Sequence, residues 1–153
     1  MNRVNKHKRD AGFTLIEVLV AIVVMAVGLL GFALLQTMSV RFAQSANYRT
    51  QATNLTYELI DQMRANRVTA STYLGSYTAT TDAAHCIPEV GLDRRAEHFK
   101  TAWQCRLGRA LGEGASATVE QVPGDLIEVQ VAWGDERWVT NSDAVTFTAR
   151  TRL

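Results

Sequence analysis

The stretch that decides the fold is residues 12–36, GFTLIEVLVAIVVMAVGLLGFALLQ, in which apolar side chains follow one another almost without interruption. As an α-helix rising about 1.5 Å per residue, residues 13–35 would be roughly 34 Å long, enough to cross the hydrocarbon core of a bilayer. Glu17 is the only ionisable residue between Phe13 and Leu35. Because an ionised carboxylate inside a bilayer costs about 2.5 kcal/mol or more unless it is paired or reaches the interface, a simple membrane anchor does not explain it.

The residues before this stretch are basic. Arg3, Lys6, Lys8 and Arg9 outnumber Asp10, and the rest of the chain is negative although the formal net charge of the whole is +1. The positive-inside rule therefore predicts a cytoplasmic amino terminus, a single inner-membrane crossing and a periplasmic globular part. Beyond the leader we find no cluster of basic residues of the kind that binds phosphates, so no nucleic-acid partner is expected.

A cleavable secretory signal is a competing interpretation of the same residues. Such a signal has a shorter apolar core and small residues at its cleavage site. Here the apolar run is long and is followed by Gln36, Thr37 and Met38. We therefore expect the apolar segment to be retained in the mature protein.

Residues 12–17, GFTLIE, together with the basic leader and the apolar segment, resemble the type III signal of the type IV pilin family. In that family a prepilin peptidase of the inner membrane cuts after the glycine and methylates the new amino terminus. The resemblance implies cleavage between Gly12 and Phe13, methylation of Phe13, and a role for Glu17 in subunit registry and assembly. The run VGLLG, residues 27–31, resembles the PilV type of minor pilin.

The role implied for Glu17 has a physical basis. Cleavage would turn the uncharged amide nitrogen of Phe13 into a cation, and N-methylation would keep that charge. In a bundle of such helices, Glu17 of one subunit could neutralise the amino terminus of its neighbour, which would fix the register of the two subunits. The alternative is that Glu17 only lies near the start of its own helix, favoured by the helix dipole, or reaches the membrane interface.

The helix is predicted to continue beyond the apolar stretch, because residues 32–74 contain no Pro or Gly. We expect one helix from Phe13 to about Val68, the second half of which packs one apolar stripe on a small domain. The stripe consists of Tyr48, Ala52, Leu55, Leu59, Ile60 and Met63.

The remaining residues predict a small α+β domain of pilin-like architecture. Thr69 to Val90 read as a loop-rich connector with room for a short strand. A second helix is expected from Asp93 to Leu111, unless Gly108 ends it a turn early. Alternating apolar and polar residues then predict a C-terminal antiparallel sheet with strands at residues 118–122, 126–133 and 144–152. The expected division is a removed leader at 1–12, a transmembrane or filament-core helix at 13–35, and a periplasmic domain at 36–153.

Cys86 and Cys105 both fall on the predicted periplasmic side, where disulfides persist. We expect a disulfide between them, worth about 3 kcal/mol for a loop of about twenty residues, with two buried free thiols as the alternative. His85 and His98 lie nearby in the sequence, but their spacing lacks the paired ligands of a zinc site. No metal and no other cofactor is expected.

No residues form a recognisable catalytic motif, and we expect no enzyme activity. The sequence has no G-x-S-x-G pattern, and the glycines of residues 111–116 lack the lysine of a phosphate-binding loop. Trp103 and Trp133 are expected in the core of the small domain. Trp138, in a predicted loop, is the better candidate for a contact between subunits.

The resemblance implies a minor pilin that enters a type IV pilus, or the complex that primes it, with consequences for surface motility and attachment. Its implied partners are the prepilin peptidase and methyltransferase, other minor pilins and the major pilin. A pseudopilin of a type II secretion system shares the amino-terminal motif and is the first alternative. A membrane-tethered periplasmic binding module, whose leader would be retained, is the alternative from another class.

Overall fold

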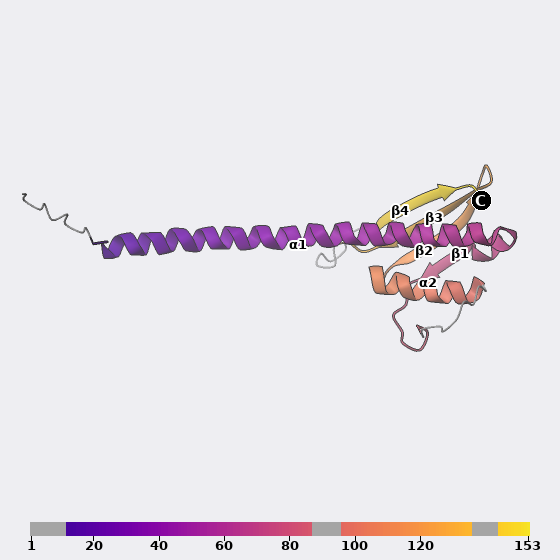
Figure 1. Ribbon diagram of the computed structural model, residues 1–153, viewed down its shortest axis with the longest axis horizontal. Helices are drawn as coiled ribbons and strands as arrows, with labels where there is room; N and C mark the ends of the chain where they lie inside the picture. The colour runs from indigo at the N-terminus through magenta and orange to yellow at the C-terminus, as the bar shows by residue number, and fades with distance from the viewer. Residues whose placement is uncertain (1–11, 87–95, 136–143) are drawn as a thin grey trace, which may run out of the picture. The chain divides into compact units, whose positions relative to one another are not determined.

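The computed structural model describes residues 12–86, 96–135 and 144–153. The chain divides into two compact units, Met1–Phe42 and Ala43–Leu153. Helix α1, Leu15–Ala65, contributes residues to both units (Figure 1). The second unit also contains helix α2, Ala96–Leu111, and a four-stranded sheet, so the α+β, pilin-like architecture predicted from the sequence is confirmed.

In the second unit, α1 buries the predicted apolar stripe apart from Tyr48, which is half-buried. Its buried residues are Ala52, Leu55, Thr56, Leu59, Ile60 and Met63. The helix ends at Ala65, so the expected end near Val68 is wrong by about one turn. A 3₁₀ helix, η1, follows at Arg67–Tyr73. Within it the hydroxyl of Thr72 donates a 2.6 Å hydrogen bond to the Thr69 carbonyl, the kind of local side-chain bond that competes with a regular α-helix.

The sheet is antiparallel throughout, in the order β1-β2-β3-β4. Its strands are β1 Gly75–Thr78, β2 Ser116–Val122, β3 Leu126–Trp133 and β4 Val145–Thr151. The three predicted strands are confirmed to within two residues at each end. Strand β1 is the short strand for which the connector had room, and it adds a fourth strand to the predicted sheet by pairing Tyr77 with Ala117 of β2.

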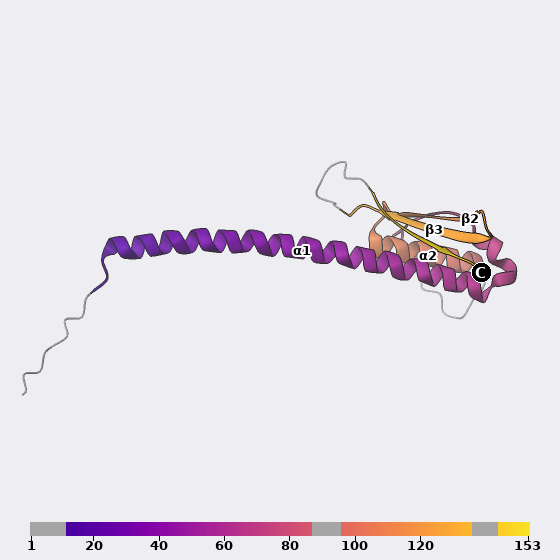
Figure 2. The same cartoon turned by 90° about the horizontal axis from the view of Figure 1, so that it is seen from above.

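Helix α2 spans Ala96–Leu111. Its predicted first residue, Asp93, lies outside the described residues. At the other end Gly108 does not stop the helix. Gly112 does, since it takes a φ of 93° that is strained for other residues. Figure 2 shows α2 and the second half of α1 on the same face of the sheet, so the unit has two layers.

The core lies between these two layers. Trp103 of α2 and Trp133 of β3 are 0% and 2% exposed, which confirms the prediction for both. The indole N–H of Trp103 donates a 3.0 Å hydrogen bond to the Leu55 carbonyl of α1. The ring of Tyr77 meets the Trp103 ring edge to face, with 5.3 Å between centroids. Trp138 lies outside the described residues, and its role in subunit contact stays a prediction.

Gly108 stands where the backbone of the connector after β1 packs directly against α2. A β-carbon at this position would overlap the carbonyl oxygen of Thr80 and come within 2.7 Å of its carbonyl carbon. The Thr80 N–H also donates to the Gln104 carbonyl at 3.3 Å. The absence of a side chain at Gly108 therefore lets the connector approach the helix closely.

We predict that Gly108→Ala lowers the free energy of unfolding of the second unit by about 1–3 kcal/mol, because the Thr80 backbone must move. Replacing Gly by Ala would otherwise stabilise a helix by about 1 kcal/mol. A decrease in the stability of the variant is therefore attributable to the steric overlap with Thr80. Gly114→Ala is the matched control, since a β-carbon there meets nothing within 4 Å. Chemical denaturation of the full chain in detergent, followed by tryptophan fluorescence, measures both. Equal stabilities would contradict the packing argument.

Tyr77 gives the second unit a dependence on alkaline pH. Its side chain is 3% exposed and its hydroxyl donates a 2.5 Å hydrogen bond to the Tyr73 carbonyl. Burial, with a smaller contribution from Glu97, raises the pKa of Tyr77 to about 12. The phenol therefore stays neutral in the folded state at pH values at which it ionises in the unfolded chain.

We predict that the stability contributed by Tyr77 is complete below pH 10 and is lost as the pH rises from about 10 to about 12. The unfolded state releases this proton first, and the loss is on the order of 2 kcal/mol. The difference in unfolding free energy between the parent chain and Tyr77→Phe, measured from pH 9 to pH 12, should shrink accordingly. Tyr57→Phe, at an exposed position, should show no such trend.

Candidate functional site

The candidate site is the segment from Gly12 to Glu17, around the beginning of α1. Gly12, Phe13 and Thr14 precede the helix and are exposed. The Phe13 side chain is 82% exposed, and no described atom lies within 4 Å of where a β-carbon on Gly12 would be. Because proteolysis favours exposed backbone outside regular structure, the bond between Gly12 and Phe13 is accessible to a peptidase.

Thr14 caps the helix. The N–H of Glu17 donates to the Thr14 hydroxyl at 3.3 Å and to the Thr14 carbonyl at 3.1 Å. A threonine followed three residues later by a glutamate is the sequence pattern of a capping box. This role of Thr14 is absent from the sequence prediction, although the Thr-x-x-Glu spacing would have revealed it.

The carboxylate of Glu17 has a different environment from its N–H. It lies in the first turn of α1, where the helix dipole favours a negative charge. Within the described part of the chain, no hydrogen bond or ion pair engages this carboxylate, and the residue is exposed. The carboxylate is therefore available to a cation outside the chain.

The first half of α1 presents a largely apolar surface, continuous from Val18 to Leu35 and then interrupted by polar residues such as Gln36 and Arg41. From Leu15 to Phe42 the large apolar side chains are about half to nine-tenths exposed, for example Leu15 at 89% and Phe42 at 72%. Among the described helices, α1 alone is long and apolar enough to cross a membrane. Contiguous apolar surface of this size marks a place where lipid or protein binds, so the segment fits a membrane anchor.

The structure joins Cys86 and Cys105 by a disulfide, with the two Cα atoms 5.6 Å apart. This bond links the connector after β1 to helix α2, and both residues are buried. Both sulfur atoms are therefore already bonded. Two contacts lower the pKa of the Asp82 carboxyl. The backbone N–H of Ala84 contributes most, and the ring of His85, which lies 2.7 Å from a carboxylate oxygen, contributes next.

Neither histidine belongs to a metal site in the described ranges, where no three His, Cys, Asp or Glu side chains are placed to hold a metal ion. The sequence-predicted residues therefore fall into two separate groups. Gly12, Phe13 and Glu17 lie together around the beginning of α1, whereas Cys86 and Cys105 stabilise the second unit.

Comparison with known proteins addresses the first of these groups. No curated protein and no solved structure gave a significant match. Residues 7–33 match the family model described as the prokaryotic N-terminal methylation motif. The match contains Gly12, Phe13, Thr14 and Glu17 and most of the exposed apolar surface, and this motif indicates a structural subunit of the type IV pilin-like or pseudopilin kind.

Proposed function

We propose that this protein is a minor pilin that is processed at the inner membrane and then incorporated into a type IV pilus or the complex that primes it. The observation that carries the proposal is the methylation motif at residues 7–33, combined with an exposed, non-helical bond between Gly12 and Phe13. A prepilin peptidase cuts this bond, and its methyltransferase activity then modifies the nitrogen of Phe13. The chain itself has a structural role and performs no catalysis.

The proposal assigns each part of the chain a place. Residues 1–12 are the cytoplasmic leader that is removed, because their basic charge favours the cytoplasmic side. Residues 13–35 cross the inner membrane and later enter the filament core. Residues 36–153 form the periplasmic domain, where the oxidising environment supports the disulfide between Cys86 and Cys105.

The chemical consequence of processing falls on Glu17. Before cleavage the Phe13 nitrogen is an amide without charge, and after cleavage it is a cation. Two opposite charges in an apolar bundle are far more stable together than apart, since removing one partner of a buried pair costs about 3–5 kcal/mol. The unengaged carboxylate of Glu17 therefore pairs with the amino terminus of a neighbouring subunit and sets the register between them.

The partners of this protein are then the prepilin peptidase, the other minor pilins and the major pilin. The run VGLLG at residues 27–31 supports the PilV type within this group. A pseudopilin of a type II secretion system would carry the same motif and the same Glu17. Co-purification separates the two, because pilus subunits would accompany a minor pilin and secretion pseudopilins would accompany the alternative.

We predict that the mature chain extracted from membranes begins at Phe13 and carries one additional methyl group on its amino nitrogen. Intact mass and amino-terminal fragmentation of the purified protein measure both changes. A host strain that lacks the peptidase is the control and should give the chain with residues 1–12 attached. If the protein from a strain that has the peptidase still begins at Met1, that result would support a tethered binding module and overturn the pilin proposal.

We predict that Glu17→Gln leaves membrane insertion intact but lowers incorporation into filaments by roughly a hundred-fold, because about 3 kcal/mol of charge pairing is lost per subunit. Glutamine keeps the size of the side chain and the capping box. The ratio of sheared filament to membrane-bound protein measures the effect. Thr37→Ala is the control, since Thr37 is exposed on the same helix and its hydroxyl bonds only the Ala33 carbonyl. Unchanged incorporation of Glu17→Gln would refute the pairing.

A further inference from the structure

Thr14 lies between the bond proposed for cleavage and helix α1, and its hydrogen bonds define where the helix begins. The Thr14 carbonyl accepts from the N–H of Val18 at 3.3 Å, which closes the first full turn. The Thr14 hydroxyl accepts from the N–H of Glu17, also at 3.3 Å. These are the bonds of an N-cap residue, whose carbonyl belongs to the helix while its own backbone lies outside it. Helix α1 accordingly begins at Leu15, and residues 12–14 are non-helical.

The sequence offers a competing start for the same helix. Gly12 lies two residues before Thr14, and glycine caps helices about as well as threonine. A helix capped by Gly12 would have Phe13 as its first helical residue. The bond between Gly12 and Phe13 would then belong to the helix terminus instead of lying outside regular structure.

Tertiary packing does not decide between the two starts. Gly12, Phe13 and Thr14 are all exposed, and a β-carbon added to Gly12 would meet no further atom of the described chain within 4 Å. The bond from the Glu17 N–H to the Thr14 hydroxyl is specific to the observed start. In a helix capped by Gly12, Thr14 would be inside the first turn and its hydroxyl would no longer cap.

We infer that Thr14 is a positioning residue for the cleavage, because its cap holds the start of α1 at Leu15 and keeps the bond between Gly12 and Phe13 in exposed, non-helical backbone. Proteolysis favours such backbone, so a shift of the helix start toward Gly12 lowers the fraction of precursor that can be cut. Thr14 acts here through the conformation of the chain. The inference rests on the proposed function, since Thr14 positions this bond for a reaction only if a peptidase cuts it.

Direct recognition of the Thr14 side chain by the peptidase is the competing explanation, and two substitutions separate it from capping. Thr14→Val keeps nearly the same shape and a similar helix propensity but has no hydrogen-bond acceptor. Thr14→Asn changes the shape but supplies one of the best N-cap side chains. Capping predicts that Asn preserves cleavage and Val slows it, whereas recognition of shape predicts the reverse.

Initial rates of leader removal test the inference. The full-length precursor, purified in detergent, is mixed with membranes that contain a prepilin peptidase, and mass spectrometry follows the loss of residues 1–12. We expect Thr14→Val to be cut about three- to five-fold more slowly than the parent chain, the factor by which loss of a cap shifts a helix start, and Thr14→Asn to stay within about two-fold. Thr37→Val is the matched control, because the Thr37 hydroxyl bonds the Ala33 carbonyl within the helix and caps no terminus.

Amide hydrogen exchange of the uncut precursors measures the helix start itself. In the parent chain the N–H of Ile16 is among the first-turn groups that an α-helix leaves without a partner inside the helix. In a helix capped by Gly12, this N–H would bond the Gly12 carbonyl four residues back. We therefore expect exchange at Ile16 to slow several-fold in Thr14→Val and to match the parent chain in Thr14→Asn.

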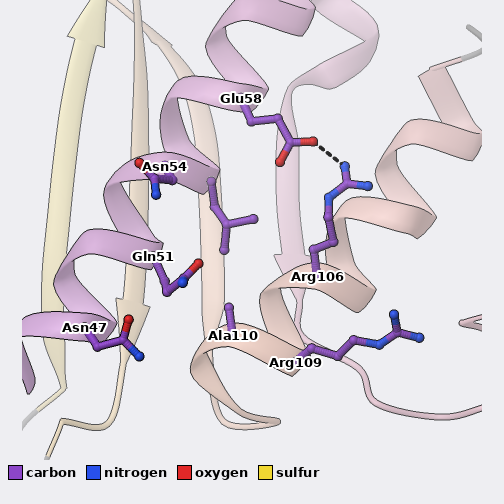
Figure 3. Close-up of a pocket in the computed structure, with 8 residues that line it drawn as sticks. Asn47, Gln51, Asn54, Glu58, Arg106, Arg109 and Ala110 are labelled. Atoms are coloured by element: carbon purple, nitrogen blue, oxygen red, sulfur yellow. Dashed lines mark ion pairs between the residues drawn. The ribbon is translucent and has the colours of Figure 1, made fainter. Parts of the chain in front are cut away.

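A second control separates the helix start from the stability of the second unit. Arg106 of α2 forms an ion pair with Glu58 of α1 at 2.6 Å, the dashed line in Figure 3. Arg106→Gln removes this pair and should lower the unfolding temperature of the second unit, yet the precursor should be cut at the parent rate. If Arg106→Gln slows the cut as much as Thr14→Val does, stability and not the cap controls cleavage, and the inference is overturned.

The remaining outcomes distinguish this inference from the proposed function. Equal rates for the parent chain and Thr14→Val, or slower cutting of Thr14→Asn than of Thr14→Val, would overturn the inference and leave the proposed function intact. A slower cut of Thr14→Val with unchanged exchange at Ile16 would also overturn it, since the helix start would not have moved. A parent precursor that the peptidase does not cut between Gly12 and Phe13 would overturn the proposed function and this inference with it.

Discussion

The exposed apolar surface of α1 is the constraint on which the rest of this protein depends. From Leu15 to Phe42 the helix presents large apolar side chains that nothing in the described part of the chain covers. Water cannot solvate such a surface favourably, so lipid or the helices of other chains must bury it. The protein therefore acts by association. Its first unit fits a membrane anchor, and the methylation motif lies at the start of that unit.

The second unit is held by contacts that fix the backbone of its parts. Trp103 bonds the Leu55 carbonyl and thereby ties α2 to α1 through a buried polar group that would otherwise be unsatisfied. The lack of a side chain at Gly108 allows the Thr80 backbone to pack against α2. The disulfide between Cys86 and Cys105 attaches the same connector to α2 six residues further along the chain. These contacts fix the positions of α1 and α2 within the second unit.

Elements whose hydrophobic pattern continues over many residues were predictable from the sequence. The stripe from Ala52 to Met63 repeats at helical spacing, and β3 alternates apolar and polar residues from Ile127 to Val131, so the pattern of apolar residues indicates both. Strand β1 has four residues and one large apolar side chain, Tyr77, which leaves too little pattern to separate it from a loop. Its position in the sheet depends on pairing with β2 about forty residues away.

The candidate site was predictable in part and for a different reason. Gly12, Phe13 and Glu17 were identified by their resemblance to a processing signal, and the match at residues 7–33 agrees with that. The capping role of Thr14 is readable from the Thr-x-x-Glu spacing, because its hydroxyl accepts from the Glu17 backbone N–H, which is present whatever the charge of that side chain. The proposed partner of the Glu17 carboxylate lies in another molecule, so no property of one chain can specify it.

The outer edge of the sheet, formed by strand β4, affects how copies of a membrane-anchored protein interact with one another. Strand β4 closes the strand order with β3 as its neighbour, and among the described strands no other pairs with its second edge. Its solvent-facing positions hold Thr146, Thr148 and Arg150, the last of which pairs with Glu128 of β3, and polar and charged side chains on an edge strand discourage strand addition by another chain. Anchored proteins diffuse in two dimensions and collide often in similar orientations. An edge strand that resists strand addition allows many copies to remain separate and folded in the plane of the membrane instead of aggregating.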